Sequence, residues 1–220
     1  MPNRDLQGRV VAVVGSTGGL GRALVDVLEQ RGSTVVRVGH SEPADVDLDL
    51  RDSTAGATLA EHCRTVHGRL DGVIVAAGIV AFGNLVDTDD VVMEELFLTN
   101  ALGPMWLAKQ VAPALQETQG FFVSISGVVA ETPMPGMAAY SASKAAVAAA
   151  MESIRREFRR SRVDVIDARP PHTETGLATR PLAGSAPKMP PGLTPQVVAE
   201  RIVLAIERNA SVVGPDDFSS

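Results

Sequence analysis

Short apolar runs rich in valine and isoleucine alternate along this chain of 220 residues with longer stretches whose apolar residues recur at helical spacing. Most of the runs are continuously apolar, which is typical of strands buried on both faces of a parallel sheet. The helical stretches between them would cover those two faces. The sequence therefore predicts an α/β protein with a doubly wound parallel sheet in three layers, αβα. The predicted strands span residues 10–14, 34–38, 72–76, 120–125, 164–168 and 211–213.

One connection is too short for this pattern. About six residues separate the second strand from the acidic segment 45–50, whereas a parallel crossover needs about a dozen or more, usually with a helix. We therefore expect a short third strand at the edge of the sheet, reached by a bare loop. Residues 1–220 are expected to form one domain. The predicted helices span residues 19–31, 54–67, 90–116, 138–160 and 195–208.

Composition narrows the classes of partner. The net charge is −6, and an acidic protein repels phosphate backbones, so we expect no nucleic acid partner. No apolar run approaches the roughly 20 residues of a membrane span, and the first residues lack an apolar signal core. The single cysteine, Cys63, excludes an internal disulfide, and the histidines show no paired metal spacing. We expect a cytoplasmic protein that binds a small molecule, no membrane and no metal.

A glycine-rich loop lies between the first predicted strand and the first predicted helix. Gly15, Gly19 and Gly21 form the spacing G-x-x-x-G-x-G. Glycines at such a turn let a phosphate approach the backbone, and the helix start offers unpaired N–H groups and the positive end of its dipole. The loop therefore predicts a phosphate site, with a tight turn that binds nothing as the alternative.

Tyr140 and Lys144 are four residues apart in an alanine-rich stretch without helix breakers. At this spacing they share a helix face. A phenol has a pKa of about 10, and a cation one turn away lowers it, so the pair is a candidate for proton transfer. Tyr140 is the only tyrosine of the chain. The alternative is a surface helix with a half-buried tyrosine.

Together these features resemble the short-chain dehydrogenase/reductase family, and the resemblance covers nearly the whole chain. It implies a Rossmann-type doubly wound sheet. Segment 75–78 resembles the family's N-N-A-G turn, and Asp49-Leu50 resembles its adenine-binding Asp-Val pair. Asn100 resembles the helix asparagine of its catalytic tetrad. Segment 170–175 resembles its P-G-x-x-x-T nicotinamide segment, with Pro171 in place of glycine.

The resemblance implies roles for the tetrad. Tyr140 would be the general acid or base, Lys144 would lower its pKa and bind the nicotinamide ribose, and Asn100 would hold a helix kink and a water. The family's serine lies thirteen residues before the tyrosine, where this chain has Gly127. Ser126 is the nearest substitute, although strand alternation points its side chain away from that of residue 127.

The cofactor expected from the resemblance is NADP(H) rather than NAD(H). No acidic residue stands at Gly39, where an NAD site needs one, and His40 and Ser41 could accommodate a phosphate, although Glu42 leaves NAD(H) open. The expected cofactor-binding residues are Gly15, Ser16, Thr17, Gly19, Leu20, Gly21, His40, Ser41, Asp49, Leu50, Ala76, Ala77, Gly78, Asn100, Tyr140, Lys144, Pro170, Thr173 and Thr175.

The sequence thus predicts an NADP(H)-dependent oxidoreductase that transfers hydride between nicotinamide and a carbonyl or alcohol of a small apolar substrate. Segment 176–195, rich in proline and glycine, is expected to be a substrate lid, with a plain surface connection as the alternative. The resemblance implies a homodimer or homotetramer. Because of Gly127, two rival functions stay open: a cofactor-binding sensor or scaffold, and a dehydratase, epimerase or imine reductase.

Overall fold

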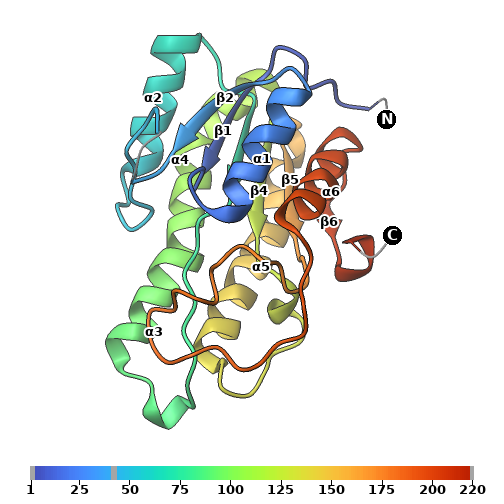
Figure 1. The fold of residues 1–220 in the computed structure, drawn as a ribbon. Coiled ribbons are helices and arrows are strands. Elements are labelled where there is room, and N and C mark those ends of the chain that lie inside the picture. The colour runs from blue at the N-terminus through green and yellow to red at the C-terminus, as the bar shows by residue number, and fades with distance from the viewer. Residues whose placement is uncertain (1–2, 41–43, 219–220) are drawn as a thin grey trace.

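A six-stranded, all-parallel sheet with the strand order β2-β1-β3-β4-β5-β6 forms the middle of the protein (Figure 1). This computed structural model describes residues 3–40 and 44–218. The sheet confirms the predicted fold class, and its strands start and end within a residue of the predicted bounds. The strands are β1 Val10–Val14, β2 Thr34–Val38, β3 Gly72–Val75, β4 Phe121–Ile125, β5 Asp164–Ala168 and β6 Val212–Val213.

Helices cover both faces of the sheet, as expected for a doubly wound fold (Figure 1). Helices α1 (Gly19–Gln30) and α6 (Pro195–Glu207) pack together on one face. Helices α2 (Ala55–His67), α4 (Gly103–Thr118) and α5 (Ala138–Phe158) pack on the other. The strands are continuously apolar because they separate two buried cores.

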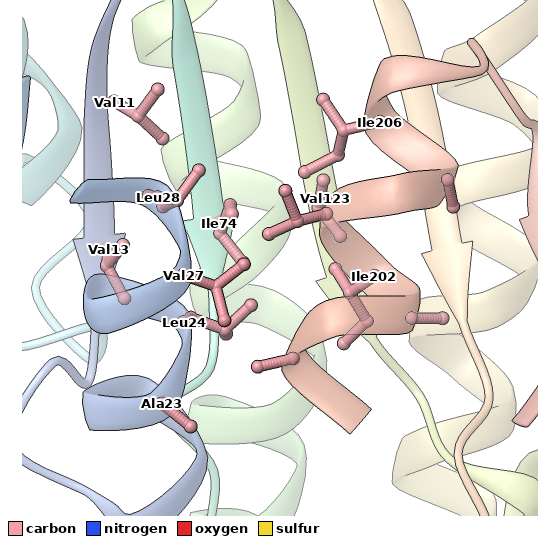
Figure 2. Close-up of a cluster of buried hydrophobic side chains, with 14 of the residues drawn as sticks. Val11, Val13, Ala23, Leu24, Val27, Leu28, Ile74, Val123, Ile202 and Ile206 are labelled. Carbon is pink, nitrogen blue, oxygen red and sulfur yellow. The ribbon is translucent and has the colours of Figure 1, made fainter. Parts of the chain in front are cut away.

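The core under α1 and α6 shows how strand alternation serves both faces. Figure 2 shows Val11 and Val13 on the same side of β1 as Leu24 and Leu28 of α1. Val10, Ala12 and Val14, the residues between and beside them, belong to the core on the opposite face. Successive side chains of a strand point to opposite faces, so all of β1 is buried.

Strand β1 has β2 on one side and β3 on the other, so the chain reverses its winding direction beside it. In open α/β sheets, ligands bind outside the carboxyl ends of the strands at such a switch point. Val14 and Val75 are register partners at those ends. The loops after β1 and β3 therefore lie where a ligand site is expected.

The short third strand predicted at the sheet edge is reduced to a single bridge. Only Val46 pairs with the sheet, through a single parallel bridge to Val38 at the edge beside β2. The N–H groups of Asp45 and Val46 both donate to the carbonyl of Arg37, and the Asp45 carboxylate accepts from the Arg37 N–H at 2.7 Å. The Asp45 side chain thus binds a backbone N–H group at this edge that a longer strand would need. In the described residues, no ladder longer than this one bridge forms.

Residues 90–116 are helical, as predicted, but the helix changes type around Asn100. It consists of α3 (Asp90–Phe97), a π-helix (Leu98–Leu102) and α4. Pro104 lies in the first turn of α4 and Pro113 inside it, so neither proline lies in the π-helical segment. That segment contains Asn100, which the family resemblance expected to hold a helix kink.

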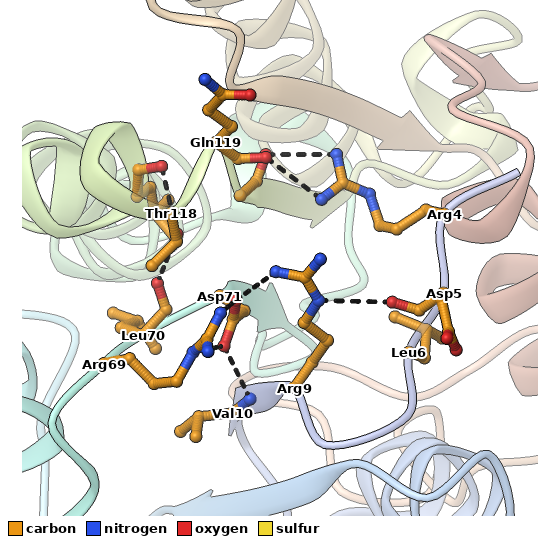
Figure 3. A network of polar contacts seen from close by, with 12 residues as sticks. Arg4, Asp5, Leu6, Arg9, Val10, Arg69, Leu70, Asp71, Thr118 and Gln119 are labelled. Atoms are coloured by element: carbon orange, nitrogen blue, oxygen red, sulfur yellow. Dashed lines mark hydrogen bonds and ion pairs between the residues drawn. The ribbon is translucent and has the colours of Figure 1, made fainter. Parts of the chain in front are cut away.

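A polar network ties together the amino ends of the strands (Figure 3). The Asp71 side chain is 1 % exposed and binds Arg9 at 2.8 Å and Arg69 at 2.6 Å, and it accepts from the Val10 N–H at 2.9 Å. Burial raises the pKa of Asp71, but the two guanidinium groups and the Val10 N–H together outweigh it and hold the pKa below its usual value. The network lies at the opposite end of the strands from the switch point.

Candidate active site

The glycine-rich loop passes directly against the loop after β3. Gly15 has a φ of +83°, and a Cβ atom there would lie 2.6 Å from the Ala77 nitrogen. The N–H groups of Ala76 and Ala77 donate to the Val14 carbonyl. Glycine at residue 15 therefore allows both the turn and the close approach. The predicted residues of the first loop and of the N-N-A-G-like turn are brought together at the switch point.

The segment that resembles the nicotinamide-binding motif packs against the same glycine-rich loop. A Cβ atom on Gly19 would lie 2.6 Å from the Thr175 carbonyl oxygen. Thr173, two residues earlier, pairs with Leu193 in an isolated bridge. The Pro170 carbonyl accepts from the Val128 N–H just beyond β4. Two predicted cofactor-binding segments more than 150 residues apart in sequence thus meet at the start of α1.

Residues expected near the adenosine lie at the ends of β1 and β2. The Ser16 hydroxyl donates to the Val38 carbonyl at 3.2 Å. A Cβ atom on Gly39 would lie 3.6 Å from the Thr17 hydroxyl oxygen, which is an ordinary van der Waals contact. His40 is exposed, and its Nδ1 lies 3.1 Å from Asp47 Oδ1. Ser41 and Glu42 lie outside the described residues.

Arg51 engages the aspartate of the expected adenine pair. Its guanidinium binds Asp49 Oδ2 at 2.7 Å, and this hydrogen bond holds the pKa of Asp49 below its usual value. The next residue, Leu50, is buried against Gly103 in α4. Leu20 is buried in the first turn of α1. The residues expected at the adenine thus comprise a carboxylate held by Arg51 and apolar packing.

Tyr140 and Lys144 lie one turn apart on α5, as predicted. Lys144 is buried, and its ammonium donates to the Ile125 carbonyl at the end of β4 at 2.8 Å. Its Nζ lies 6.0 Å from the centroid of the Tyr140 ring. Helix α5 thus places both side chains at the carboxyl end of the sheet.

Burial, rather than mutual attraction, dominates the proton affinities of this pair. It raises the pKa of Tyr140 to about 12. It lowers the pKa of Lys144 to about 8, and the negative charge of Asp167 acts in the opposite direction. The predicted lowering of the Tyr140 pKa by Lys144 is thus reversed in the protein alone, because removing a phenolate from water costs more than the nearby cation restores.

Asn100 explains the π-helix. Its Oδ1 accepts from the Ile79 N–H at 3.0 Å, and its Nδ2 donates to the Ile79 carbonyl at 2.9 Å and to Ser143 Oγ at 3.1 Å. Ser143 in turn donates to the Tyr140 carbonyl at 2.7 Å. A Cβ atom on Gly78 would lie 3.1 Å from Asn100 Oδ1 and 3.4 Å from Lys144 Nζ. One amide therefore joins the loop after β3 to the turn of α5 that carries Tyr140.

Ser126 has a different partner from the one its predicted role requires. It is fully buried, and its hydroxyl donates to Asp167 Oδ1 of β5 at 2.6 Å. The other carboxylate oxygen of Asp167 binds Arg169 Nε at 2.6 Å. Gly127 has φ +77° and ψ 164°, a region populated essentially by glycine. This geometry argues against Ser126 as a substitute for the missing hydroxyl.

Three residues of this site escaped the sequence reasoning: Ile79, Ser143 and Asp167. Asp167 is a charged residue inside an apolar strand. A buried carboxylate needs partners, so this pattern was the available signal that Asp167 belongs to a polar cluster. Ser143 lies between Tyr140 and Lys144 in sequence, but its role depends on Asn100, which is 43 residues away. Within the described residues, no three His, Cys, Asp or Glu side chains gather as metal ligands.

The predicted lid covers the Tyr140 side of the sheet. The Leu182 N–H donates to the Val80 carbonyl at 2.8 Å, and the Phe82 N–H donates to the Ala183 carbonyl at 2.9 Å. Beside Tyr140 lies a small hollow that is partly open to solvent and has a cavity volume of about 10 Å³. Its lining is mostly apolar and includes Ala81, Phe82, Thr88, Leu96, Met137 and Tyr140.

The open sheet, the glycine loop at its switch point and the Tyr/Lys pair define an α/β oxidoreductase with a dinucleotide-type fold. The short chain dehydrogenase family profile matches residues 9–183, and the chain belongs to this family of oxidoreductases. Dehydrogenase/reductase SDR family member 7B of Xenopus tropicalis is 30 % identical over 91 % of this chain and 75 % of its own length. An 11-beta-hydroxysteroid dehydrogenase A of Sesamum indicum is 29 % identical over 71 % of this chain and 50 % of its own.

Solved structures share the fold. A short chain dehydrogenase from Burkholderia cenocepacia, in complex with NADP, superposes with a TM-score of 0.84 at 23 % identity, covering 98 % of this chain and 92 % of that one. Ligand-free aldohexose dehydrogenase of Thermoplasma acidophilum gives 0.85 at 21 % identity, covering 99 % and 96 %. None of the helices in residues 3–40 and 44–218 combines the length and the apolar composition needed to cross a membrane.

Proposed function

We propose that this protein is an NADP(H)-dependent oxidoreductase that interconverts a carbonyl and an alcohol on a small apolar substrate. The observation that carries the proposal is the Tyr140–Lys144 pair at the carboxyl end of β4, with Lys144 bound to the Ile125 carbonyl at 2.8 Å. The substrate class follows from the mostly apolar lining of the hollow beside Tyr140.

The residues present fit a nicotinamide dinucleotide. Gly15 and Gly19 let the loop backbone pass close to Ala77 and Thr175 at the start of α1, where helix N–H groups and the helix dipole favour a pyrophosphate. Asp49 and Leu50 would hold the adenine, Lys144 the nicotinamide ribose, and segment 170–175 the nicotinamide. When bound, the cofactor supplies or accepts the hydride.

The remaining chemistry belongs to this chain. Tyr140 donates its hydroxyl proton to the substrate oxygen during reduction and accepts it during oxidation. The Lys144 ammonium stabilises the phenolate that forms at Tyr140, and Asn100 fixes the turn of α5 through Ser143 and the Tyr140 carbonyl. The apolar lid excludes water from the reacting atoms.

The preference for NADP(H) rests on the end of β2. Residue 39 is a glycine, so no carboxylate stands there to repel a 2′-phosphate. His40 follows directly, and its Nδ1 lies 3.1 Å from Asp47 Oδ1. A 2′-phosphate would compete with this carboxylate for the His40 ring.

Titration of the purified protein with NADPH and NADH, followed by the fluorescence of its single tryptophan, tests the proposal. We expect NADPH to bind at least tenfold more tightly, and His40→Ala to narrow the difference. Ketones are then screened for oxidation of the bound cofactor. Binding of neither nucleotide would refute the proposal, and ketone reduction that survives Tyr140→Phe would refute the mechanism.

Gly127 supports a second candidate within the same class of reaction. Without a hydroxyl at residue 127, the substrate oxygen lacks one of its two polarising donors, and the loss of one such donor costs on the order of 10²–10³ in rate. An imine carries its own basic nitrogen and depends less on that donor. Cyclic imines therefore belong in the same screen, and turnover of imines without turnover of ketones would favour imine reduction.

Three further properties belong to this proposal. Segment 176–195 acts as a substrate lid within a single domain of residues 1–220. The protein works as a homodimer or homotetramer in the cytoplasm. The lid is supported by its backbone hydrogen bonds to Val80 and Phe82. The oligomer is supported by exposed apolar side chains on α4 and α5.

A further inference from the structure

Lys144 is a buried cation with one hydrogen-bond acceptor in the described residues, the Ile125 carbonyl at 2.8 Å. A buried ammonium is costly unless an anion compensates it. Asn100 and Ser143, which pack nearby, are neutral. The proposed reaction needs Lys144 to keep its charge, so the source of compensation matters.

Asp167 lies on the same side of the sheet as Lys144. Ser124 is its register partner on β4, and Ser126 binds its carboxylate at 2.6 Å. Lys144 binds the carbonyl of the residue between these two serines. Asp167 is 3 % exposed, so little water screens its charge.

We propose that Asp167 is a positioning residue of the active site: its carboxylate, fixed by Ser126 and Arg169, is the buried counter-charge that keeps the Lys144 ammonium protonated at the end of β4. Ser126 was predicted from the sequence as a catalytic serine. In this proposal it acts indirectly, by holding the carboxylate that compensates the Lys144 charge. The proposal deepens the proposed function, because it explains how Lys144 stays charged there.

The other charged groups around Lys144 do not replace Asp167. Arg169 is a cation, and it is shared between Asp167 and Glu131. Glu152, two turns further along α5, is held by Arg155 and Arg156. Tyr140 is neutral at physiological pH, because burial raises its pKa to about 12. Burial lowers the pKa of Lys144 to about 8, and Asp167 is the anion that opposes this effect.

The chain has only three lysines, Lys109, Lys144 and Lys188, so the charge on Lys144 can be read directly. Carbon-13 labelling of the lysine ε-carbons gives three NMR signals, and Lys144→Met assigns the one that matters. Asp167→Asn keeps the side-chain volume and an acceptor for Ser126 but removes the charge. We expect its Lys144 titration midpoint to fall by about one pH unit.

Two further variants make the test specific. Asp164→Asn removes the same charge from the same strand, but this carboxylate is 38 % exposed and binds Arg4, so we expect no change in the midpoint. Arg169→Gln removes the cation that offsets Asp167, so the midpoint should rise. A midpoint that stays at the wild-type value in Asp167→Asn would overturn the proposal. If Asp167→Asn does not fold, Arg169→Gln decides: a rise supports the proposal, and no rise overturns it.

The pH dependence of NADPH binding separates this inference from the proposed function. If Lys144 binds the cofactor, the dissociation constant should rise with pH around the same midpoint and shift with it in Asp167→Asn. A shifted NMR midpoint in a protein that binds neither nucleotide leaves the counter-charge standing and refutes the proposed function. An unshifted midpoint in a protein that binds NADPH refutes the counter-charge and leaves the proposed function standing.

Discussion

Gly127 shows how a single residue decides what the active site can do. Its φ of +77° and ψ of 164° suit glycine alone. A Cβ atom there would meet only the Pro170 carbonyl at 3.8 Å and Val129 Cγ2 at 4.0 Å. There is room for a side chain, so the obstacle to a hydroxyl is the backbone conformation and not a clash. Restoring the serine is therefore a conformational problem.

The variants Gly127→Ser and Gly127→Ala test this argument as a pair. Both should lower the free energy of unfolding by about 1–3 kcal/mol, because both force a side chain into the strained region. Only the serine adds a donor. We expect urea denaturation to show similar losses in the two variants, and cofactor-coupled ketone reduction to improve in Gly127→Ser alone. Equal stability of both variants and wild type would contradict the strain.

Sequence reasoning at the residue scale was strongest where one helix holds both partners. The four-residue spacing of Tyr140 and Lys144 fixed their common face without tertiary information. The partner of Ser126 could not be predicted in this way, because Asp167 is 41 residues away on another strand. The pKa direction of Tyr140 was missed for a related reason: it depends on burial, which spacing does not report.

At the element scale, sequence periodicity could not report details that depend on a distant partner. The short edge strand predicted in segment 45–50 is reduced to one bridge, because Asp45 binds the Arg37 N–H itself. Residues 90–116 are helical as predicted, and the π-helical segment within them contains Asn100, which binds both backbone groups of Ile79. Buried apolar strands and amphipathic helices were predicted well, since their periodicity is a local property.

Asp71 joins the first residues of β1 and β3, and its removal should be costly. We expect Asp71→Asn to lower the free energy of unfolding at pH 7 by about 2–3 kcal/mol, because Arg9 and Arg69 lose their shared anion. The folded-state pKa of Asp71 is held below the ordinary aspartate value of 3.8. Its charge therefore stabilises the fold above that pH, and this stabilisation is lost as the pH falls through the folded-state pKa.

Urea unfolding at pH 7, 5 and 3 measures this dependence. The difference between wild type and Asp71→Asn should be constant from pH 7 to 5 and should shrink as acid protonates Asp71. Asp164→Asn is the matched control, because it breaks a more exposed pair and should cost less than about 1 kcal/mol. A wild-type advantage that grew in acid would contradict the assignment.

The proposed lid, residues 176–195, is held by close backbone packing. Gly184 has a φ of +71°, and a Cβ atom there would collide with the Phe82 carbonyl. We expect Gly184→Ala to open this segment, so that trypsin cleaves after Lys188 on the order of tenfold faster while the urea midpoint of the whole protein changes little. Gly176→Ala is the control: its φ is +75°, but the nearest atom lies 3.7 Å away. Equal cleavage of the two variants would contradict the role of this contact.

At the scale of the whole molecule, apolar side chains are exposed on the π-helix, α4 and α5. Leu102 and Met105 are 41 % and 39 % exposed. Ala142 and Ala149 of α5 are also exposed and offer small side chains that let another helix approach closely. Side chains of this kind are typical of a surface that a second copy of the chain covers.

We therefore expect light scattering to give a dimer or tetramer for the wild-type protein, and Ala142→Arg to dissociate it. An unpaired guanidinium buried in an interface costs about 3–5 kcal/mol, which weakens association on the order of a hundredfold or more. Ala57→Arg places the same charge on the exposed side of α2 and should leave the assembly intact. If Ala142→Arg assembled like wild type, α5 would not be the interface, and its alanines would serve only packing within the chain.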